Sequence, residues 1–280
     1  MTDLADHEWR LIRDESRDGP TQMALEEVAV RTALEEDLRT VRTYSWEPST
    51  LSLGYRQEAD SVDWDFCEHE GIGVTRRQTG GGGIYHDAHG DISYTIVTPV
   101  EEVPGDLMEC YGVFCEPILE GLNRMGVDAD FAAVPKSSIH QPSCYLRDVN
   151  PAHDIVAKTD DEGPSLKISG NAQYRRRDAV IQHGSISYDL EPERHLGTFT
   201  DHDVTVERFR KRVGSVREET GLEREEAVET LASALAEWCD AAEGSWSSDE
   251  LDAAVDLADR KYGHDSWIRD RDVPDAKSVR

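Results

Sequence analysis

The stretch from Arg76 to Asp87 carries the residue types best suited to ligand chemistry. It reads Arg-Arg-Gln-Thr-Gly-Gly-Gly-Gly-Ile-Tyr-His-Asp. Four successive glycines lose much backbone entropy on folding, which makes sense where the backbone approaches a ligand closely and points N–H groups at it. The two arginines can pair with a phosphate or a carboxylate. No Gly-Lys-Ser/Thr follows, so the tract is not a Walker loop, and the alternative interpretation is a flexible loop.

A second candidate site begins at Lys167, in the run Leu-Lys-Ile-Ser-Gly-Asn-Ala-Gln that starts at Leu166. Lysine is rare here, with six in the chain. In a short apolar strand its ammonium can act as a fixed cation for a carboxylate and then a phosphate. The alternative is an edge-strand lysine that prevents aggregation. His183 follows in Gln-His-Gly-Ser and is either a ligand contact or a histidine that satisfies a buried backbone group.

The chain has five cysteines, an odd number, with no CxxC pair and no histidine cluster at zinc-ligand spacing. Neither a disulfide framework nor a structural zinc site is indicated. Four of them, Cys67, Cys110, Cys115 and Cys239, are interpreted as small buried hydrophobic residues. Cys144 precedes Tyr145 shortly before the lysine strand and is either a nucleophile or an inert loop cysteine.

A mixture of strands and helices must position these residues. Apolar periodicity predicts helices over 21–39, over 106–125 with an interruption at Pro117, over 223–240, and over 249–262 as the last helix, capped by Ser247 or Ser248. Strands are expected on both sides of Pro48 within 40–55, at 72–76, at 91–97 with one face buried, at 156–157 paired with 166–169 across a turn at 158–164, and at 178–187. The order predicts an α+β fold, with a catalytic domain over 1–205 and a C-terminal helical segment over 206–280 packed on it.

Composition bounds the function. The 280 residues carry a formal net charge of −28, which argues against nucleic-acid binding. No apolar run approaches the roughly 20 residues of a membrane span, and the acidic N-terminus is unlike a signal peptide, so a cytoplasmic protein is expected. Abundant acids and few lysines are typical of a cytosolic protein from a high-salt archaeon. The alternative is an acidic protein from an ordinary cytoplasm.

Taken together, Arg76–Asp87, Lys167–Ala172, Gln182–Ser185 and Lys261–Trp267 resemble the ordered motifs of the lipoate–protein ligase family, over about residues 20–270. The resemblance implies a mixed or antiparallel central sheet flanked by helices, as in class II aminoacyl-tRNA synthetases and biotin ligases. It also implies ATP-dependent, AMP-forming ligation. Lipoate and ATP, with Mg²⁺ whose ligands the sequence does not identify, would form lipoyl-adenylate. The acceptor lysine of a lipoyl domain, in a 2-oxoacid dehydrogenase E2 or a glycine cleavage H protein, would then attack.

Site roles follow from the same resemblance. Lys167 would be catalytic and would contact both the lipoyl carbonyl and the phosphate. The substrate- and ATP-binding residues implied are Arg77, Thr79, Gly80, Gly81, Gly82, Gly83, Ile84, Tyr85, His86, Asp154, Ser169, Gly170, Ala172 and His183. Little chain follows Trp267, and the resemblance implies that in such short forms a separate small subunit can supply the accessory domain.

Three other activities fit parts of this pattern. A cysteine acyltransferase of the same fold would move octanoyl or lipoyl groups without ATP, using Cys144 as nucleophile with Lys167 favouring its thiolate. A biotin ligase fits less well, because its loop alternates glycine and arginine more than the tract seen here. A degenerate member would only bind lipoate or partner an enzyme.

Overall fold

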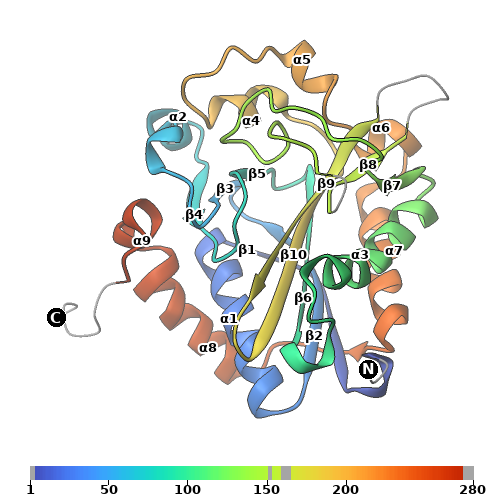
Figure 1. Cartoon of the computed structure of the whole chain (residues 1–280). Helices are drawn as coiled ribbons and strands as arrows, with labels where there is room; N and C mark the ends of the chain where they lie inside the picture. The colour runs from blue at the N-terminus through green and yellow to red at the C-terminus, as the bar shows by residue number, and fades with distance from the viewer. Residues whose placement is uncertain (1–3, 151–152, 159–164, 274–280) are drawn as a thin grey trace.

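The computed structural model describes residues 4–150, 153–158 and 165–273. A large mixed sheet lies between two pairs of helices (Figure 1). Helices α1 (Gly19–Glu35) and α8 (Ser248–Leu257) cover one face, and α3 (Leu107–Arg124) and α7 (Arg224–Cys239) cover the other. The α+β fold with a mixed sheet flanked by helices is therefore confirmed.

Two sheets are present in the described part of the chain. The large one has the strand order β11-β1-β2-β6-β10-β9-β8-β7, parallel from β11 to β2 and antiparallel from β2 onward. Its strands are β1 (Trp9–Arg17), β2 (Arg39–Trp46), β6 (Asp91–Pro99), β7 (Ala129–Phe131), β8 (Ile155–Ala157), β9 (Leu166–Arg175), β10 (Ala179–Ser187) and β11 (Ala242–Glu243). The small sheet has the order β4-β3-β5, from β3 (Thr50–Leu53), β4 (Gly73–Arg76) and β5 (Ile84–His86).

Short helices connect these elements. They are η1 (Leu4–Asp6), η2 (Ala59–Ser61), α2 (Trp64–His69), η3 (Val100–Glu102), α4 (Pro192–Gly197), α5 (Val206–Arg210), α6 (Val216–Thr220), the π-helical η4 (Ala258–Tyr262) and α9 (Asp265–Asp270). In Figure 1, α2, α4 and α5 gather with the small sheet at one end of the large sheet. The candidate site residues lie at this end.

The long helices follow the predicted periodicity, with two differences. Helix α3 is not interrupted at Pro117, because this proline is buried and packing of α3 against α7 outweighs the lost backbone hydrogen bond. The predicted last helix ends at Leu257, and η4 and α9 follow it. Ser247 is the cap of α8, in a capping box with Glu250.

The predicted strands lie where they were expected, but their sheet membership and burial differ from the prediction. The two strands around Pro48 are present, but β2 belongs to the large sheet and β3 to the small one. Strand β6 was expected to be half-buried and is buried throughout, because helices cover both faces of the sheet. Strand β9 continues beyond Ser169 to Arg175, and β1 was not predicted. The predicted turn over 158–164 lies outside the described residues from 159 onward.

The start of α1 is fixed by its sequence. The Asp18 side chain accepts a hydrogen bond of 2.8 Å from the Thr21 N–H, and Pro20 occupies the first turn. The helix then buries Met23, Leu25 and neighbouring residues against the sheet. One wall of the candidate site is thereby held by a capped helix.

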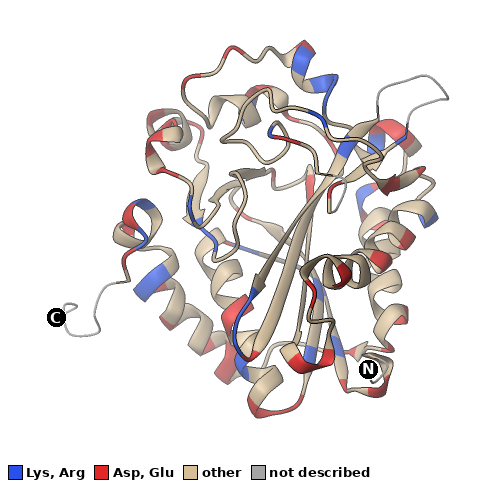
Figure 2. Cartoon of the chain, viewed as in Figure 1, with Lys and Arg blue, Asp and Glu red and all other residues tan. Residues whose placement is uncertain are grey.

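Acidic residues lie along the outer helices and their loops (Figure 2). None of the helices in the described ranges is long and apolar enough to cross a membrane.

Candidate active site

Cys144 and Lys167 meet at the end of the large sheet. Lys167 lies on β9, and its Nζ is 3.9 Å from the Cys144 Sγ and donates a 3.0 Å hydrogen bond to the Cys144 carbonyl. The carboxylate of Asp154, directly before β8, lies 2.7 Å from the same ammonium. All three side chains are buried. Segments far apart in the sequence thus bring a thiol, an ammonium and a carboxylate together in one cluster.

The charges in this group support one another. Burial alone would raise the pKa of Asp154, but the neighbouring His153 and Lys167 outweigh burial and lower this pKa to about 2. Asp154 is therefore ionised at neutral pH and holds the Lys167 ammonium in place. A cation this close to sulfur favours the negative charge that a reacting cysteine develops.

The glycine tract holds the Cys144 loop. Gly83 and Ser143 form an isolated parallel bridge, in which the Cys144 N–H donates to the Gly83 carbonyl at 2.9 Å. A Cβ on Gly82 would lie 2.9 Å from the Cys144 nitrogen. The glycines therefore allow close approach of the cysteine loop, which is neither the close approach of a ligand nor the flexible loop that the sequence suggests.

Gly170 lies next to the Cys144 sulfur, where a side chain would not fit. A Cβ at this position of β9 would lie 2.9 Å from the Cys144 Sγ, closer than real Cβ contacts. The missing side chain leaves the space that the thiol occupies.

Arg77 shapes the glycine loop from inside. Its guanidinium donates to the carbonyls of Ser52, Gly80 and Gly82 at 2.7, 2.9 and 2.7 Å, and its Nε donates to the Thr79 hydroxyl at 3.0 Å. Burial lowers the pKa of Arg77 to about 10, so it stays a cation at neutral pH. The sequence predicts that this side chain contacts a ligand, but Nε and Nη2 donate to the glycine loop and Nη1 donates to Ser52 on β3.

A buried chain of hydrogen bonds continues from Thr79. Its hydroxyl lies 2.6 Å from His183 Nε2, and His183 Nδ1 lies 2.7 Å from Glu26 Oε1. Burial acts to raise the pKa of Glu26, but His183 and Arg42 lower it overall. Helix α1, strand β10 and the glycine loop are thereby connected by side chains.

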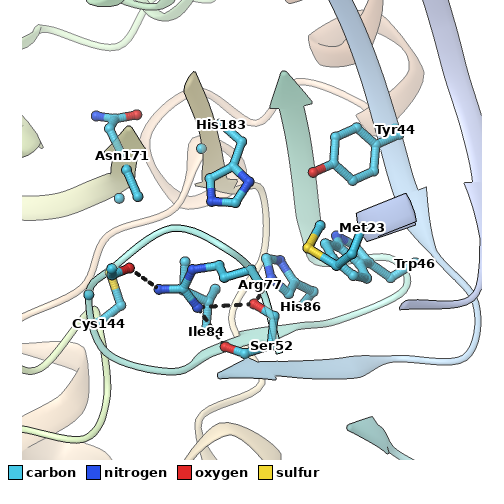
Figure 3. A pocket seen from close by; sticks show the side chains of 15 residues that line it. Met23, Tyr44, Trp46, Ser52, Arg77, Ile84, His86, Cys144, Asn171 and His183 are labelled. Carbon is cyan, nitrogen blue, oxygen red and sulfur yellow. Dashed lines mark hydrogen bonds between the residues drawn. The ribbon is translucent and has the colours of Figure 1, made fainter. Parts of the chain in front are cut away.

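A narrow cavity extends inward from Cys144, and Figure 3 shows Cys144 at one end with Met23, Tyr44 and Trp46 at the other. It is lined by Met23, Tyr44, Trp46, Ser52, Arg77, Gly80, Gly81, Ile84, His86, Cys144, Gly170, Asn171, Ala172, His183 and Gly184. A wider open groove lies on the other side of the sulfur, lined by Gly80, Gly81, Tyr111, Cys144, Arg147, Asp148, Asn150, His153, Asp154, Lys167, Asn171, Ala172 and Gln173. Cys144 lines both and stands at their junction.

The structure brings most of the predicted site residues together. Eleven of them line the cavity or the groove: Arg77, Gly80, Gly81, Ile84, His86, Cys144, Asp154, Lys167, Gly170, Ala172 and His183. The others line neither. Thr79 and Ser169 are buried, and their hydroxyls form hydrogen bonds with other side chains. Gly82 and Gly83 contact the cysteine loop, and the Tyr85 hydroxyl donates to Asp87.

Several lining residues were not predicted. Met23 was placed only as an apolar residue of a helix. Tyr44 and Trp46 are two residues apart on β2 and so share a face, but no sequence signal showed that this face borders a cavity. Asn171 lies inside the lysine motif. Its amide donates to the His153 carbonyl at 2.8 Å, which ties β9 to the loop before Asp154.

Two observations bear on the expected ATP and Mg²⁺. Within the described ranges, no cluster of three or more His, Cys, Asp or Glu side chains could hold a metal ion. Arg77, which was expected to contact phosphate, instead donates to the carbonyls of Ser52, Gly80 and Gly82. We therefore derive no step through Mg²⁺ or ATP.

Comparison with known proteins gives the family. Residues 18–238 match the lipoyl protein ligase A/B catalytic domain, and the chain belongs to this family. It is similar to Octanoyltransferase LipM of Kyrpidia tusciae, with 32% identity, 92% of this chain and 97% of the relative covered. The same enzyme of Bacillus subtilis is 30% identical, with 92% and 97% covered.

Solved structures agree on the fold. A bipartite lipoate protein ligase from Thermoplasma acidophilum matches with a TM-score of 0.78 at 22% identity, covering 96% of this chain and 99% of that chain. A lipoate-protein ligase A bound with ATP matches with a TM-score of 0.75 at 24% identity, covering 94% and 98%. At these identities the likeness supports the fold alone.

These relatives correct the predicted reaction. The sequence motifs predicted an ATP-dependent, AMP-forming lipoate–protein ligase. This prediction is wrong, because the curated relatives that match this chain over nearly their whole length are octanoyltransferases. The motifs misled because they identify the family and not the reaction: residues 18–238 match a lipoyl protein ligase catalytic domain, whereas the curated relatives are octanoyltransferases. The cysteine-dependent transferase fits the relatives better.

Proposed function

We propose that this protein transfers an octanoyl group from a carrier thioester to the acceptor lysine of a lipoyl domain, through a thioester on Cys144. The observation that carries the proposal is the Cys144 Sγ lying 3.9 Å from the Lys167 ammonium, at the junction of a narrow cavity and a wider groove. The octanoyltransferase relatives support the choice of acyl group.

The first step exchanges one thioester for another. The Cys144 sulfur bonds to the acyl carbonyl carbon, and the bond between that carbon and the carrier sulfur breaks. The carrier leaves as a thiol with the proton that Cys144 gives up. The Lys167 ammonium stabilises the charge on sulfur and on the carbonyl oxygen, and its effect is strong because the site is buried.

The second step forms the amide. A neutral acceptor amine attacks the thioester carbonyl, the carbon–sulfur bond breaks, and Cys144 regains a proton as the amine loses one. The acyl chain stays in the cavity during both steps, while carrier and acceptor approach through the open groove in turn. The first step replaces one thioester bond by another, and the second replaces a thioester bond by an amide bond. The acyl group is already activated as a thioester, so neither step needs ATP.

Lipoyl-domain proteins are the proposed acceptors. One structural neighbour was determined as a lipoate protein ligase and its E2 lipoyl domain. The sequence also predicted a small accessory chain, and that prediction is tested by offering the single chain alone to its acceptor. A salt-rich cytoplasm as the working environment is a further part of this proposal, supported by the net charge of −28.

The test compares acyl donors with a purified lipoyl domain as acceptor, in low and in molar salt. Octanoyl carrier thioester without ATP should octanoylate the domain. Octanoate or lipoate with Mg²⁺ and ATP should not. Cys144→Ala should abolish transfer, and Cys67→Ala, at a buried cysteine outside the site, should leave it intact.

Two outcomes would reject the proposal. Modification by Cys144→Ala at the rate of the unaltered chain would exclude the thioester on this residue. Failure of every donor to modify the acceptor, with lipoate bound tightly, would favour a binding protein without catalysis.

A further inference from the structure

The inner end of the cavity is a closed wall. Met23, Tyr44, Trp46 and His86 line the cavity and not the open groove, and each is at most 4% exposed. Figure 3 places Met23, Tyr44 and Trp46 on the side away from Cys144, with Arg77 and Ile84 between. An acyl chain attached to the sulfur would therefore end against this wall.

Two aromatic side chains of the wall are fixed by polar contacts. Trp46 donates from its indole to the Ser93 hydroxyl at 2.8 Å and stacks on the His86 ring, with ring centroids 4.1 Å apart. Ser52 and Asp91 hold the two His86 ring nitrogens at 2.8 and 3.2 Å. Moving either ring would break these hydrogen bonds inside the protein, which is costly.

Tyr44 is held by a contact of another kind. The Arg42 guanidinium lies over its ring, 4.0 Å from the centroid, and both residues are buried on β2. Such a cation–π contact is strengthened when it is removed from water. Tyr44 is thus a fixed part of the wall.

Met23 is the adjustable part. Its side chain is unbranched and has a thioether with no hydrogen-bond donor, so dispersion contacts alone hold it. It belongs to the buried apolar cluster between α1 and the sheet, together with Leu25, Val28 and Trp46. Truncating Met23 opens volume at the end of the cavity, and enlarging it removes volume, while the three rings stay in place.

We infer that Met23 sets the length of the acyl chain that the cavity accepts. This inference rests on the proposed function, because a chain must be attached to Cys144 for the end wall to limit it. Each buried methylene is worth about a 4-fold change in binding. Two methylenes gained or lost at the wall should therefore change selectivity about 15-fold.

The experiment measures the rate at which Cys144 is acylated by hexanoyl, octanoyl, decanoyl and dodecanoyl carrier thioesters, read by intact-protein mass spectrometry. Met23→Ala should raise the decanoyl-to-octanoyl ratio about 10-fold or more. Met23→Phe should shift preference toward hexanoyl. Val28→Ala is the matched control, since Val28 is a buried residue of the same helix and cluster that does not line the cavity, and its length profile should equal that of the unaltered chain.

Failure of the inference and failure of the proposed function are distinguishable. Normal acylation of both Met23 variants with an unchanged length profile overturns the inference and leaves the function standing. No acylation of the unaltered chain by any donor overturns both. If Met23→Ala does not fold, the direction of the shift in Met23→Phe decides, and a shift toward longer chains also overturns the inference.

Discussion

The reactive sulfur of Cys144 lies among contacts of different chemical kinds. The Lys167 ammonium supplies charge, the Gly83 carbonyl fixes the backbone, and Gly170 leaves the space for the thiol. None of these partners is adjacent to Cys144 in the sequence. Small displacements of any of them change the reaction geometry, so single-atom substitutions are informative here.

Gly170→Ala should lower octanoyl transfer by about 10- to 100-fold, because the added Cβ would lie 2.9 Å from the Cys144 sulfur and displace it. Transfer rates measured alongside thermal unfolding check this. Gly112→Ala is the control, since its Cβ on α3 would meet no atom within 4 Å. That control should keep full activity and gain up to about 1 kcal/mol of unfolding free energy. Equal activity of both variants would contradict the assigned role of Gly170.

Asp154→Asn should destabilise the fold by about 3–5 kcal/mol and suppress transfer, because the buried Lys167 ammonium loses its counter-ion. The pKa of Asp154 is lowered to about 2, so the stability it contributes is present above the usual carboxylate range and is lost as pH falls toward 2.

The double variant Asp154→Leu with Lys167→Met separates folding from chemistry. Denaturant unfolding should show recovered stability, because an apolar pair replaces the ion pair, while transfer stays absent. Transfer by the double variant would exclude Lys167 from the mechanism.

At the scale of elements, the segment after residue 205 contributes directly to the site. The Lys167 N–H donates to the Arg212 carbonyl at 2.9 Å, and the Gly214 N–H donates to the Lys167 carbonyl at 3.1 Å. The Arg212 guanidinium donates to the carbonyls of Lys136, Ser137 and Arg147 at 3.2, 3.0 and 2.9 Å. Arg212 thus connects the lysine strand to the loop that carries Cys144.

Arg212→Ala should cost about 2–3 kcal/mol and loosen the loop over 136–147, because three loop carbonyls lose a charged donor. Hydrogen exchange should show faster exchange at Ile139 and Leu146, with the strands of the large sheet still protected. Arg210→Ala is the control, since Arg210 pairs with Glu218 on the surface and should matter by less than about 1 kcal/mol. Unchanged loop protection in Arg212→Ala would remove this residue from the account.

Sequence patterns predicted elements better than their contacts. Helices α1 and α7 and strands β4 and β10 follow from local periodicity and turn residues, which act over a few residues. The contact between Lys167 and Cys144 depends on pairing between segments far apart in the chain, and local periodicity does not predict such pairing. The acyl cavity was missed for the same reason, since Met23 and Trp46 look like ordinary core residues until α1 and β2 are packed together.

The reaction was harder to predict than the fold. The glycine tract and the lysine strand supply a loop and a cation, and this combination suits either a carboxylate or a thiol as the attacking group. The discriminating residue, Cys144, stands in a loop with no periodic signal, and its distance to Lys167 appears only in three dimensions.

For the whole molecule, the excess of acidic residues sets the conditions for stability. The chain of 280 residues has a net charge of −28, so its acidic side chains repel one another in the folded state. The Debye length falls from about 30 Å at 0.01 M salt to about 3 Å at 1 M, so added salt should screen this repulsion.

The unfolding free energy should therefore rise by several kcal/mol between 0.01 M and 1 M KCl, measured by urea unfolding at constant temperature. Uncharged sucrose at matched osmolality is the control for exclusion effects. A stability that is flat or falls with KCl would argue against adaptation to salt.

The central claim is that Cys144 carries the acyl group. We would mix the protein with octanoyl carrier thioester, without acceptor or ATP, and record the mass of the intact chain and then of the peptide that contains Cys144. The account predicts a gain of one octanoyl group on Cys144, removed by hydroxylamine and absent in Cys144→Ala. An unmodified chain that nevertheless octanoylates the lipoyl domain at full rate would contradict it.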